Sequence, residues 1–179
     1  MTWNLDLSHS EVNFAVKHMM ISTVRGKFNK FSGTIDFNEA DPTHSSIDVS
    51  IDVVSIDTRD EKRDGHLKSG DFFDVEKFPA ITFKSTKVEK VSDSTAKVTG
   101  DLTIRGVSRP VVLDVTYAGQ AKSPWGTTSA GFSASTKISR KDWGLTWNVA
   151  LETGGVLVGE DISIAIEAEL VKQPDAQAA

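Results

Sequence analysis

The chain has 179 residues, of which 39% are hydrophobic, and a formal net charge of −5 at neutral pH. This length suits one domain with a sizeable core, and the acidic balance disfavours nucleic acid as a partner. Because the sequence has no cysteine, disulfides, thiolate metal sites and thiol catalysis are excluded.

Apolar and polar residues alternate with a period of two along most of the chain, which is typical of strands with one buried face. In the first such run, Val12, Phe14 and Val16 share one side. No long amphipathic helix is available to cover the apolar faces, so the strands must cover one another in a sandwich or a closed barrel. In chain order, strands are expected at 11–19, 23–28, 33–37, 46–56, 81–91, 95–104, 111–118, 128–138 and 162–171.

Two stretches interrupt this alternation. Residues 58–73 are highly charged and then aromatic, and Thr58 is placed to cap a short helix near residues 59–67. The adjacent pair Phe72 and Phe73 lies between charges, which indicates an anchor in a core or a plug at a barrel mouth. Residues 139–159, with two tryptophans and several glycines, predict a long loop or a flap over one end.

The polar residues offer no strong catalytic or metal-binding pattern. No two histidines have the helical spacing of a zinc pair, and residues 8–10, Ser-His-Ser, are best interpreted as a surface turn. Asp48 and Asp52 fit the solvated face of a strand, and no glycine loop has the spacing of a nucleotide-binding motif. We therefore predict no catalytic residue and no metal ligand.

Three polar residues have alternative interpretations. His18 shares the inward side of Val12 and Phe14, so it is either a buried histidine bonded to a backbone carbonyl, a polar contact for a ligand head group, or a metal ligand. Arg59 and Lys62 belong to a basic cluster that is either a solvated helical face or a gate attracting an anionic head group.

Short motifs are spread over residues 3 to 170. They are Trp3 with Asp6, HSEVNF at 9–14, KHM at 17–19, VRGKF at 24–28, FSG at 31–33, SIDT at 55–58, HLKSGDFFD at 66–74, FPAITF at 78–83, GDLTIRGV at 100–107 and ISRKDWG at 138–144. Taken together and in this order, they resemble the YceI-like family, also described as polyisoprenoid-binding proteins.

The resemblance implies an all-β fold: a single antiparallel up-and-down barrel, lipocalin-like and of about eight strands. It also implies a pocket for a long isoprenoid chain and, often, a homodimer. It supplies no catalytic residues, because the family has no settled activity. The expected domain spans residues 1–171, followed by a disordered tail at 172–179. No basic and apolar leader precedes the first strand, so a cytoplasmic location is expected, or a periplasmic one if a leader was removed.

The expected function is therefore binding of a polyisoprenoid, of polyprenyl or quinone type, or a similar amphiphilic lipid inside the barrel. The protein would act as a carrier, storage or sequestering protein without catalysis and without another cofactor. The alternatives are an enzyme acting on such a lipid, or a ligand-free barrel acting through protein contacts. The expected ligand-binding residues are Phe14, Val16, His18, Phe28, Ile51, Arg59, Lys62, Phe72, Phe83, Leu113, Phe132 and Ile164.

Overall fold

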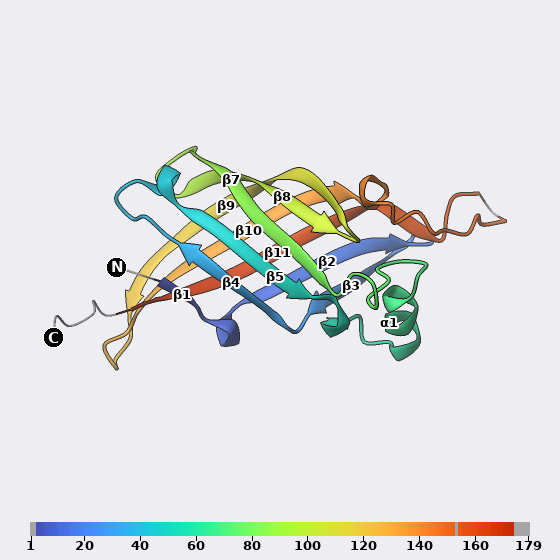
Figure 1. The fold of residues 1–179 in the computed structure, drawn as a ribbon, viewed down its shortest axis with the longest axis horizontal. Coiled ribbons are helices and arrows are strands. Elements are labelled where there is room, and N and C mark those ends of the chain that lie inside the picture. The colour runs from blue at the N-terminus through green and yellow to red at the C-terminus, as the bar shows by residue number, and fades with distance from the viewer. Residues whose placement is uncertain (1–2, 153, 174–179) are drawn as a thin grey trace.

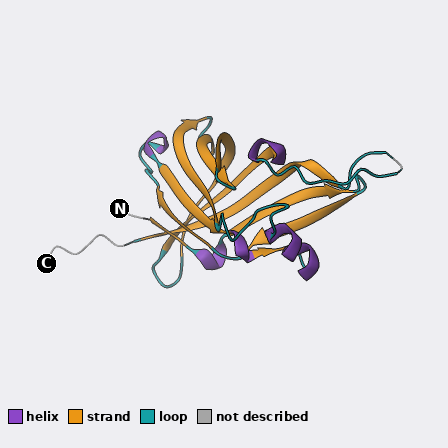
Figure 2. Cartoon of the chain, turned by 45° about the vertical axis from the view of Figure 1, so that its right-hand side comes forward, coloured by secondary structure: helices purple, strands orange, loops and turns teal. Residues whose placement is uncertain are grey.

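The computed structural model describes residues 3–152 and 154–173, in which strands of one antiparallel sheet coil around an apolar interior (Figures 1 and 2). The strands are β1 (Trp3–Leu5), β2 (Glu11–His18), β3 (Ser22–Phe28), β4 (Phe31–Asp36), β5 (Ser46–Asp52), β6 (Ile56–Asp57), β7 (Ala80–Lys90), β8 (Thr95–Ile104), β9 (Val107–Lys122), β10 (Thr128–Ser139) and β11 (Val158–Lys172). The predicted all-β antiparallel barrel is confirmed, with eleven strands in place of about eight. Two of the additional strands, β1 and β6, have only three and two residues.

The sheet runs in the order β4-β5-β7-β8-β9-β10-β11-β2-β3-β6, and β1 adds to β11. From β7 to β11 each strand pairs with the next in the chain, which is an up-and-down meander. The last strand then pairs with β2 near the start of the chain, Ile164 lying opposite Phe14. This pairing brings the inward-facing residues of both ends of the sequence onto one wall.

The barrel has a seam where its wall is not hydrogen-bonded. Within the described residues no ladder joins β4 to β1, β2 or β3, so β4 is one end of the hydrogen-bonded sheet. The strand β1 nevertheless lies beside β4, with Cα atoms within 8 Å. Side chains close the gap there, including the rings of Trp3 and Phe37, whose centroids lie 5.6 Å apart. The hydrogen-bonded wall is thus a half-barrel that side chains complete.

Several expected strand ends are corrected by the structure, and the strand expected at 111–118 is longer at both ends, as β9. The strand predicted at 46–56 stops at Asp52, whose side chain accepts a hydrogen bond from the Val54 amide and begins a 3₁₀ turn at Val53–Ser55. At the other end of the chain, β11 continues to Lys172, which pairs with Trp3. The first residue of the expected disordered tail is therefore in a strand, and residues 174–179 lie outside the described part of the chain.

The predicted short helix is α1 (Glu61–Lys68), and its cap differs from the expectation. Asp60 caps the helix, because its carboxylate accepts hydrogen bonds from the amides of Lys62 and Arg63. Thr58 is instead buried and binds two helix side chains. Its hydroxyl donates to Asp64 and accepts from Arg63 Nε at 2.8 Å. These bonds hold α1 against the residue that follows β6, at one end of the barrel.

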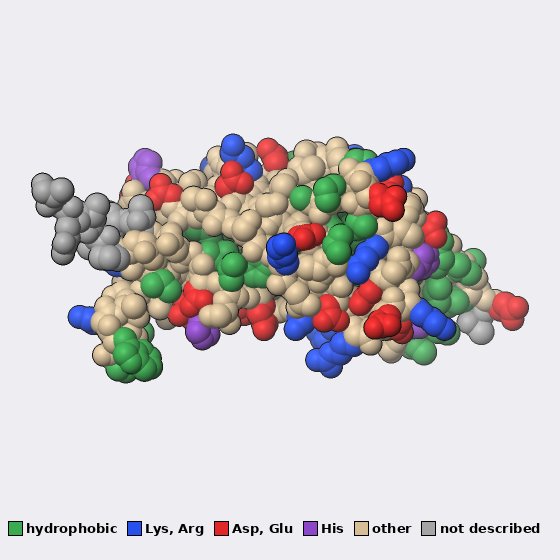
Figure 3. All heavy atoms as spheres, turned by 60° about the horizontal axis from the view of Figure 1, so that its bottom comes forward, with side chains coloured by type: hydrophobic (Ala, Val, Ile, Leu, Met, Phe, Trp, Pro, Cys, Tyr) green, Lys and Arg blue, Asp and Glu red, His purple; other side chains and the backbone are tan. Residues whose placement is uncertain are grey.

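Acidic and basic side chains alternate over the outer face of the molecule (Figure 3), with no continuous basic surface on the side shown. Among the described residues, no helix has the length and apolar character needed to cross a membrane.

Candidate functional site: a hydrocarbon-lined cavity

The interior of the barrel contains a cavity of about 320 Å³. Its wall is formed almost wholly by aliphatic and aromatic side chains, drawn from all eleven strands and from the segments that close the two ends. It extends from Leu5 and Phe37, near the seam, to Leu145 and Val158 at the opposite end. Such a wall offers dispersion contacts and almost no hydrogen bonds, so it suits a hydrocarbon chain.

The structure places nine of the twelve expected ligand-binding residues on this wall. They are Phe14, Val16, Phe28, Ile51, Phe72, Phe83, Leu113, Phe132 and Ile164. The period-two alternation identified those on strands correctly, because successive side chains point to opposite faces. Phe72 and Phe73 both reach the cavity from the turn after α1 and pack into the hydrophobic core, so the expected burial of this pair is confirmed.

The other three expected residues do not line the cavity. His18 is the last residue of β2, and the register of β2 against β11 shifts between Val158 and Ile162. Its pairing with β3 is regular, so His18 keeps the side of Val16, but it lies at the end of the strand and is not among the residues that line the cavity. Arg59 and Lys62 are exposed beside the start of α1. None of the three is among the residues that line the cavity, and their role as a polar rim for a head group stays a prediction.

Several wall residues were not singled out from the sequence. Val98, Leu102 and Ile104 line the cavity and share one side of β8, so the alternation within 95–104 carried their signal. Leu67 reaches the cavity from α1 and Leu145 from the flap. Neither lies on a strand, so no alternation could indicate them.

Two glycines make room for the aromatic side chains of the wall. A Cβ atom on Gly26 would meet the Phe14 ring, and one on Gly100 would meet Phe83 and lie 2.7 Å from the Lys84 carbonyl oxygen. Any side chain at these positions must push the ring toward the cavity. The glycines thus help to set the cavity's width.

We expect Gly26→Ala to destabilise the fold by about 1–3 kcal/mol, because the added methyl group overpacks the Phe14 ring. It should also weaken binding of a long-chain ligand, since the displaced ring narrows the cavity. Chemical denaturation and a binding titration measure the two effects. Gly65→Ala is the control, because nothing lies within 4 Å of its added Cβ and helix propensity favours alanine. Equal results for both variants would contradict this role of Gly26.

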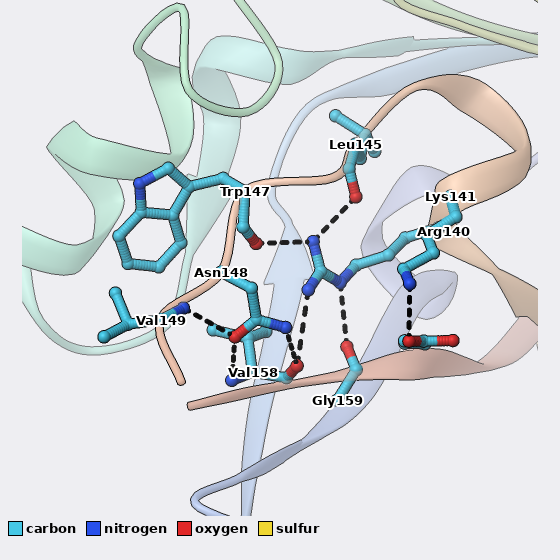
Figure 4. Close-up of polar contacts among 9 residues, drawn as sticks. Arg140, Lys141, Leu145, Trp147, Asn148, Val149, Val158 and Gly159 are labelled. Carbon is cyan, nitrogen blue, oxygen red and sulfur yellow. Dashed lines mark hydrogen bonds and ion pairs between the residues drawn. The ribbon is translucent and has the colours of Figure 1, made fainter. Parts of the chain in front are cut away.

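One end of the cavity is covered by a segment called the flap, residues 140–152 and 154–157, that is held by Arg140 (Figure 4). The Arg140 side chain is 3% exposed. Its Nε donates to the Gly159 carbonyl at 2.8 Å, and its Nη1 donates to the carbonyls of Leu145 and Trp147 at 2.7 and 2.9 Å. Its Nη2 donates to the Val158 carbonyl at 3.3 Å. Burial lowers the pKa of Arg140, and the nearby Glu160 carboxylate opposes that change.

Further contacts hold the flap against α1 and β8. Trp143 is buried and its indole Nε1 donates to the Leu102 carbonyl at 2.9 Å. The ring of Trp147 packs at right angles on His66, with centroids 4.6 Å apart, and also against Phe72. Of the stretch expected to be a long loop or a flap, the part from Arg140 to Trp147 packs over one end of the cavity, whereas Leu157 bonds to Val149 and to Met19 at the β2–β3 turn.

The opposite end of the cavity is an aromatic cluster. The Phe37 ring packs against Tyr117 and Phe132 at centroid distances of 5.7 and 5.1 Å, and against Trp3 on its other side. Outside this cluster, Glu39 accepts hydrogen bonds from Gln120 and, at 3.1 Å, from Lys172. These bonds lower the pKa of Glu39 and hold the β4–β5 loop against β9 and β11.

A small polar group lies outside the cavity at the turn before β2. The Asp6 carboxylate accepts from Ser8, and His9 Nδ1 lies 2.9 Å from Asp6 and 3.1 Å from Ser8 Oγ. A serine–histidine–acid relay needs two different ring nitrogens, whereas here one nitrogen faces both partners. Glu169 lies close enough to Asp6 and His9 for the three to approach one metal ion. Each of the three residues offers one ligand atom and none is buried, so the group fits a surface turn as well as it fits a metal site.

The Asp6–His9 pair should give stability a bell-shaped pH dependence. Hydrogen bonds from Ser8 and His9 lower the pKa of Asp6 from 3.8 to about 2, so its contribution is complete above pH 3.8 and is lost as pH falls toward 2. The same hydrogen bond raises the pKa of His9 above 6.5, so that contribution is complete below pH 6.5 and is lost at higher pH. The stability difference between wild type and Asp6→Asn should therefore peak near pH 5. Denaturation at several pH values measures it, and a flat difference would contradict the pairing.

The fold and the cavity together define a class of protein: an antiparallel β-barrel built around a hydrocarbon-lined interior. A profile of the YceI-like domain matches residues 3–170. The chain is 40% identical over 159 residues to protein YceI of Escherichia coli O157:H7, an alignment covering 89% of this chain and 81% of that protein. This chain belongs to the YceI-like family.

Solved structures agree with that assignment. The YCEI protein of Campylobacter jejuni is 38% identical, with a TM-score of 0.75 and coverage of 88% of this chain and 90% of that one. A polyisoprenoid binding domain from Saccharophagus degradans has a TM-score of 0.69 and covers 97% of this chain and 99% of its own. Its sequence is 14% identical, so this likeness concerns the fold alone.

Proposed function

We propose that this protein binds one long-chain amphiphilic lipid of polyisoprenoid type inside the barrel and acts as a carrier, storage or sequestering protein without catalysis. The observation that carries the proposal is the cavity wall, which is hydrocarbon from the aromatic cluster to the flap. The lipid's tail would lie along this wall. The Saccharophagus degradans protein of similar fold is a polyisoprenoid binding domain, which is consistent with the proposal.

The energetics favour a long tail. Burying one methylene contributes about 0.8 kcal/mol, whereas association costs roughly 4–15 kcal/mol in lost freedom. A tail of roughly five to twenty methylenes is needed to offset that cost. A short hydrocarbon would therefore bind weakly, and a prenyl chain of several units would bind well.

A non-catalytic role is favoured by the polar groups near the cavity. Arg140 and Trp143 point their donors at backbone carbonyls of the flap and β8, and the Ser8, His9 and Asp6 group lies outside the wall. Within the described residues, these groups do not assemble a nucleophile and base on the cavity surface. The lipid would be held and released unchanged.

Native mass spectrometry of the protein purified gently from its own host tests the proposal. A copurifying lipid of discrete mass, unchanged after incubation, is the expected result. Conversion of that lipid would favour an enzyme acting on it. Absence of any lipid, together with failure to take up added prenyl lipid, would favour a barrel that acts through protein contacts.

A further inference from the structure

The two ends of the cavity differ in how their buried donors are used. At the flap end, the Arg140 guanidinium makes four hydrogen bonds and the Trp143 indole makes one. At the aromatic end, Trp3 is 4% exposed and its indole Nε1 has no partner. Over residues 3–152 and 154–173 it is the one buried side-chain nitrogen or oxygen left without a hydrogen bond.

An unpartnered buried donor costs about 1–3 kcal/mol, and native structures contain few of them. In Trp3 the donor belongs to a ring that packs on Phe37, and Phe37 lines the cavity. The Trp3 ring does not itself line the cavity, and the Phe37 ring separates the two. A head group would have to displace the Phe37 ring to reach the indole.

We propose that Trp3 is a specificity-determining residue whose indole N–H donates a hydrogen bond to the head group of the bound lipid. This inference rests on the proposed function and adds an orientation to it. The head lies at the aromatic end near the seam, and the tail runs toward the flap. Trp3 would then distinguish a lipid that has a polar head group from a plain hydrocarbon.

The surroundings of Trp3 select an uncharged oxygen acceptor. The Lys172 ammonium lies 5.3 Å from the centre of the Trp3 ring, but it is paired with Glu39 at 3.1 Å. The neighbouring groups Phe37 and Leu170 are apolar and would leave an anionic head without a counter-charge. The head group that fits is a carbonyl oxygen, as in a ketone, an ester or a quinone.

The test compares wild type with Trp3→Phe, which keeps a ring and removes the N–H. Binding of farnesylacetone, of a hydrocarbon of equal chain length and of farnesyl monophosphate is measured by titration. Trp3→Phe should weaken binding of the ketone about fivefold to tenfold and leave the hydrocarbon unchanged. The wild type should also bind the ketone more tightly than the phosphate. Tighter binding of the phosphate, lost in Trp3→Phe, would overturn the choice of an uncharged head.

Trp143→Phe is the matched control for stability. Trp143→Phe removes a donor that is bonded to the Leu102 carbonyl, so the variant should lower the free energy of unfolding. Trp3→Phe removes a donor that has no partner, so no hydrogen bond of the free protein is lost. If Trp3→Phe does not fold, ¹⁵N spectra of the wild type give the answer. The Trp3 indole proton signal should move downfield with the ketone and not with the hydrocarbon.

The possible failures are distinguishable. Equal losses for ketone and hydrocarbon in Trp3→Phe, or no loss for either, would overturn the role of Trp3 while the proposed function stands. Failure of the wild type to bind any of the three probes would overturn the proposed function, and this inference with it.

Discussion

Phe14→Asp should lower the free energy of unfolding by about 3–5 kcal/mol, or prevent folding, because it places a carboxylate in a hydrocarbon wall. Phe14 lines the cavity at the centre of β2, and its ring packs against Phe28 at a centroid distance of 5.5 Å. Burial would raise the pKa of the new carboxyl group, so the loss should be smaller near pH 4 than near pH 7. Chemical denaturation at both pH values measures it.

Ala15→Asp is the matched control, one residue along the same strand. Ala15 lies on the opposite face and pairs across the sheet with Arg25, which is exposed. This substitution should change stability by less than about 0.5 kcal/mol. Retention of both stability and lipid binding by Phe14→Asp would mean that Phe14 points outward and that the inward face of β2 is assigned incorrectly.

Arg140→Met should cost at least about 3 kcal/mol, because it removes a donor from four carbonyl groups of the flap and β11, of which that of Val158 keeps the Asn148 amide as a donor. The four carbonyls belong to Leu145, Trp147, Val158 and Gly159. The flap should become mobile, and hydrogen exchange of the amides in residues 145–158 should quicken. Thermal denaturation and hydrogen exchange measure the two effects.

Two controls separate the geometry of Arg140 from its charge. Arg140→Lys keeps the charge but cannot reach all four carbonyls, so its loss should be intermediate. Lys141→Met removes the neighbouring cation, which is half exposed and paired with Glu160 at 2.7 Å, and should cost less than about 1 kcal/mol. Equal losses from Arg140→Met and Lys141→Met would contradict the role of Arg140 in holding the flap.

The wall of the cavity was predictable from the sequence because alternation is a local signal. In the runs that contain Phe14, Leu113 and Ile164, the alternation shows which side chains share a face of the strand. Because only one face of a barrel strand is buried, the apolar face must be the one that forms the wall. The fold class and most strand positions follow from the same signal. The aromatic pair Phe72 and Phe73 was identifiable because two large rings between charges need burial.

The polar contacts were not predictable in the same way. Arg140 lies beside Lys141 in a motif that looks like solvated charge, and its partners are carbonyls whose positions depend on the path of the flap. His18 shares the side of Val16 but is the last residue of β2, and alternation does not indicate where along a strand the cavity ends. The position of the seam between β1 and β4 depends on which strands far apart in the sequence pair with each other. No local sequence pattern indicates this pairing.

The most direct test of the central claim is a titration of the protein with prenyl alcohols of increasing chain length. If the cavity holds the tail, affinity should rise roughly fourfold for each added methylene equivalent and level off when the cavity is full. Ala134→Phe adds a ring to the wall, so its plateau should come at a shorter chain. Affinity that does not depend on chain length, and that Ala134→Phe leaves unchanged, would contradict binding inside the barrel.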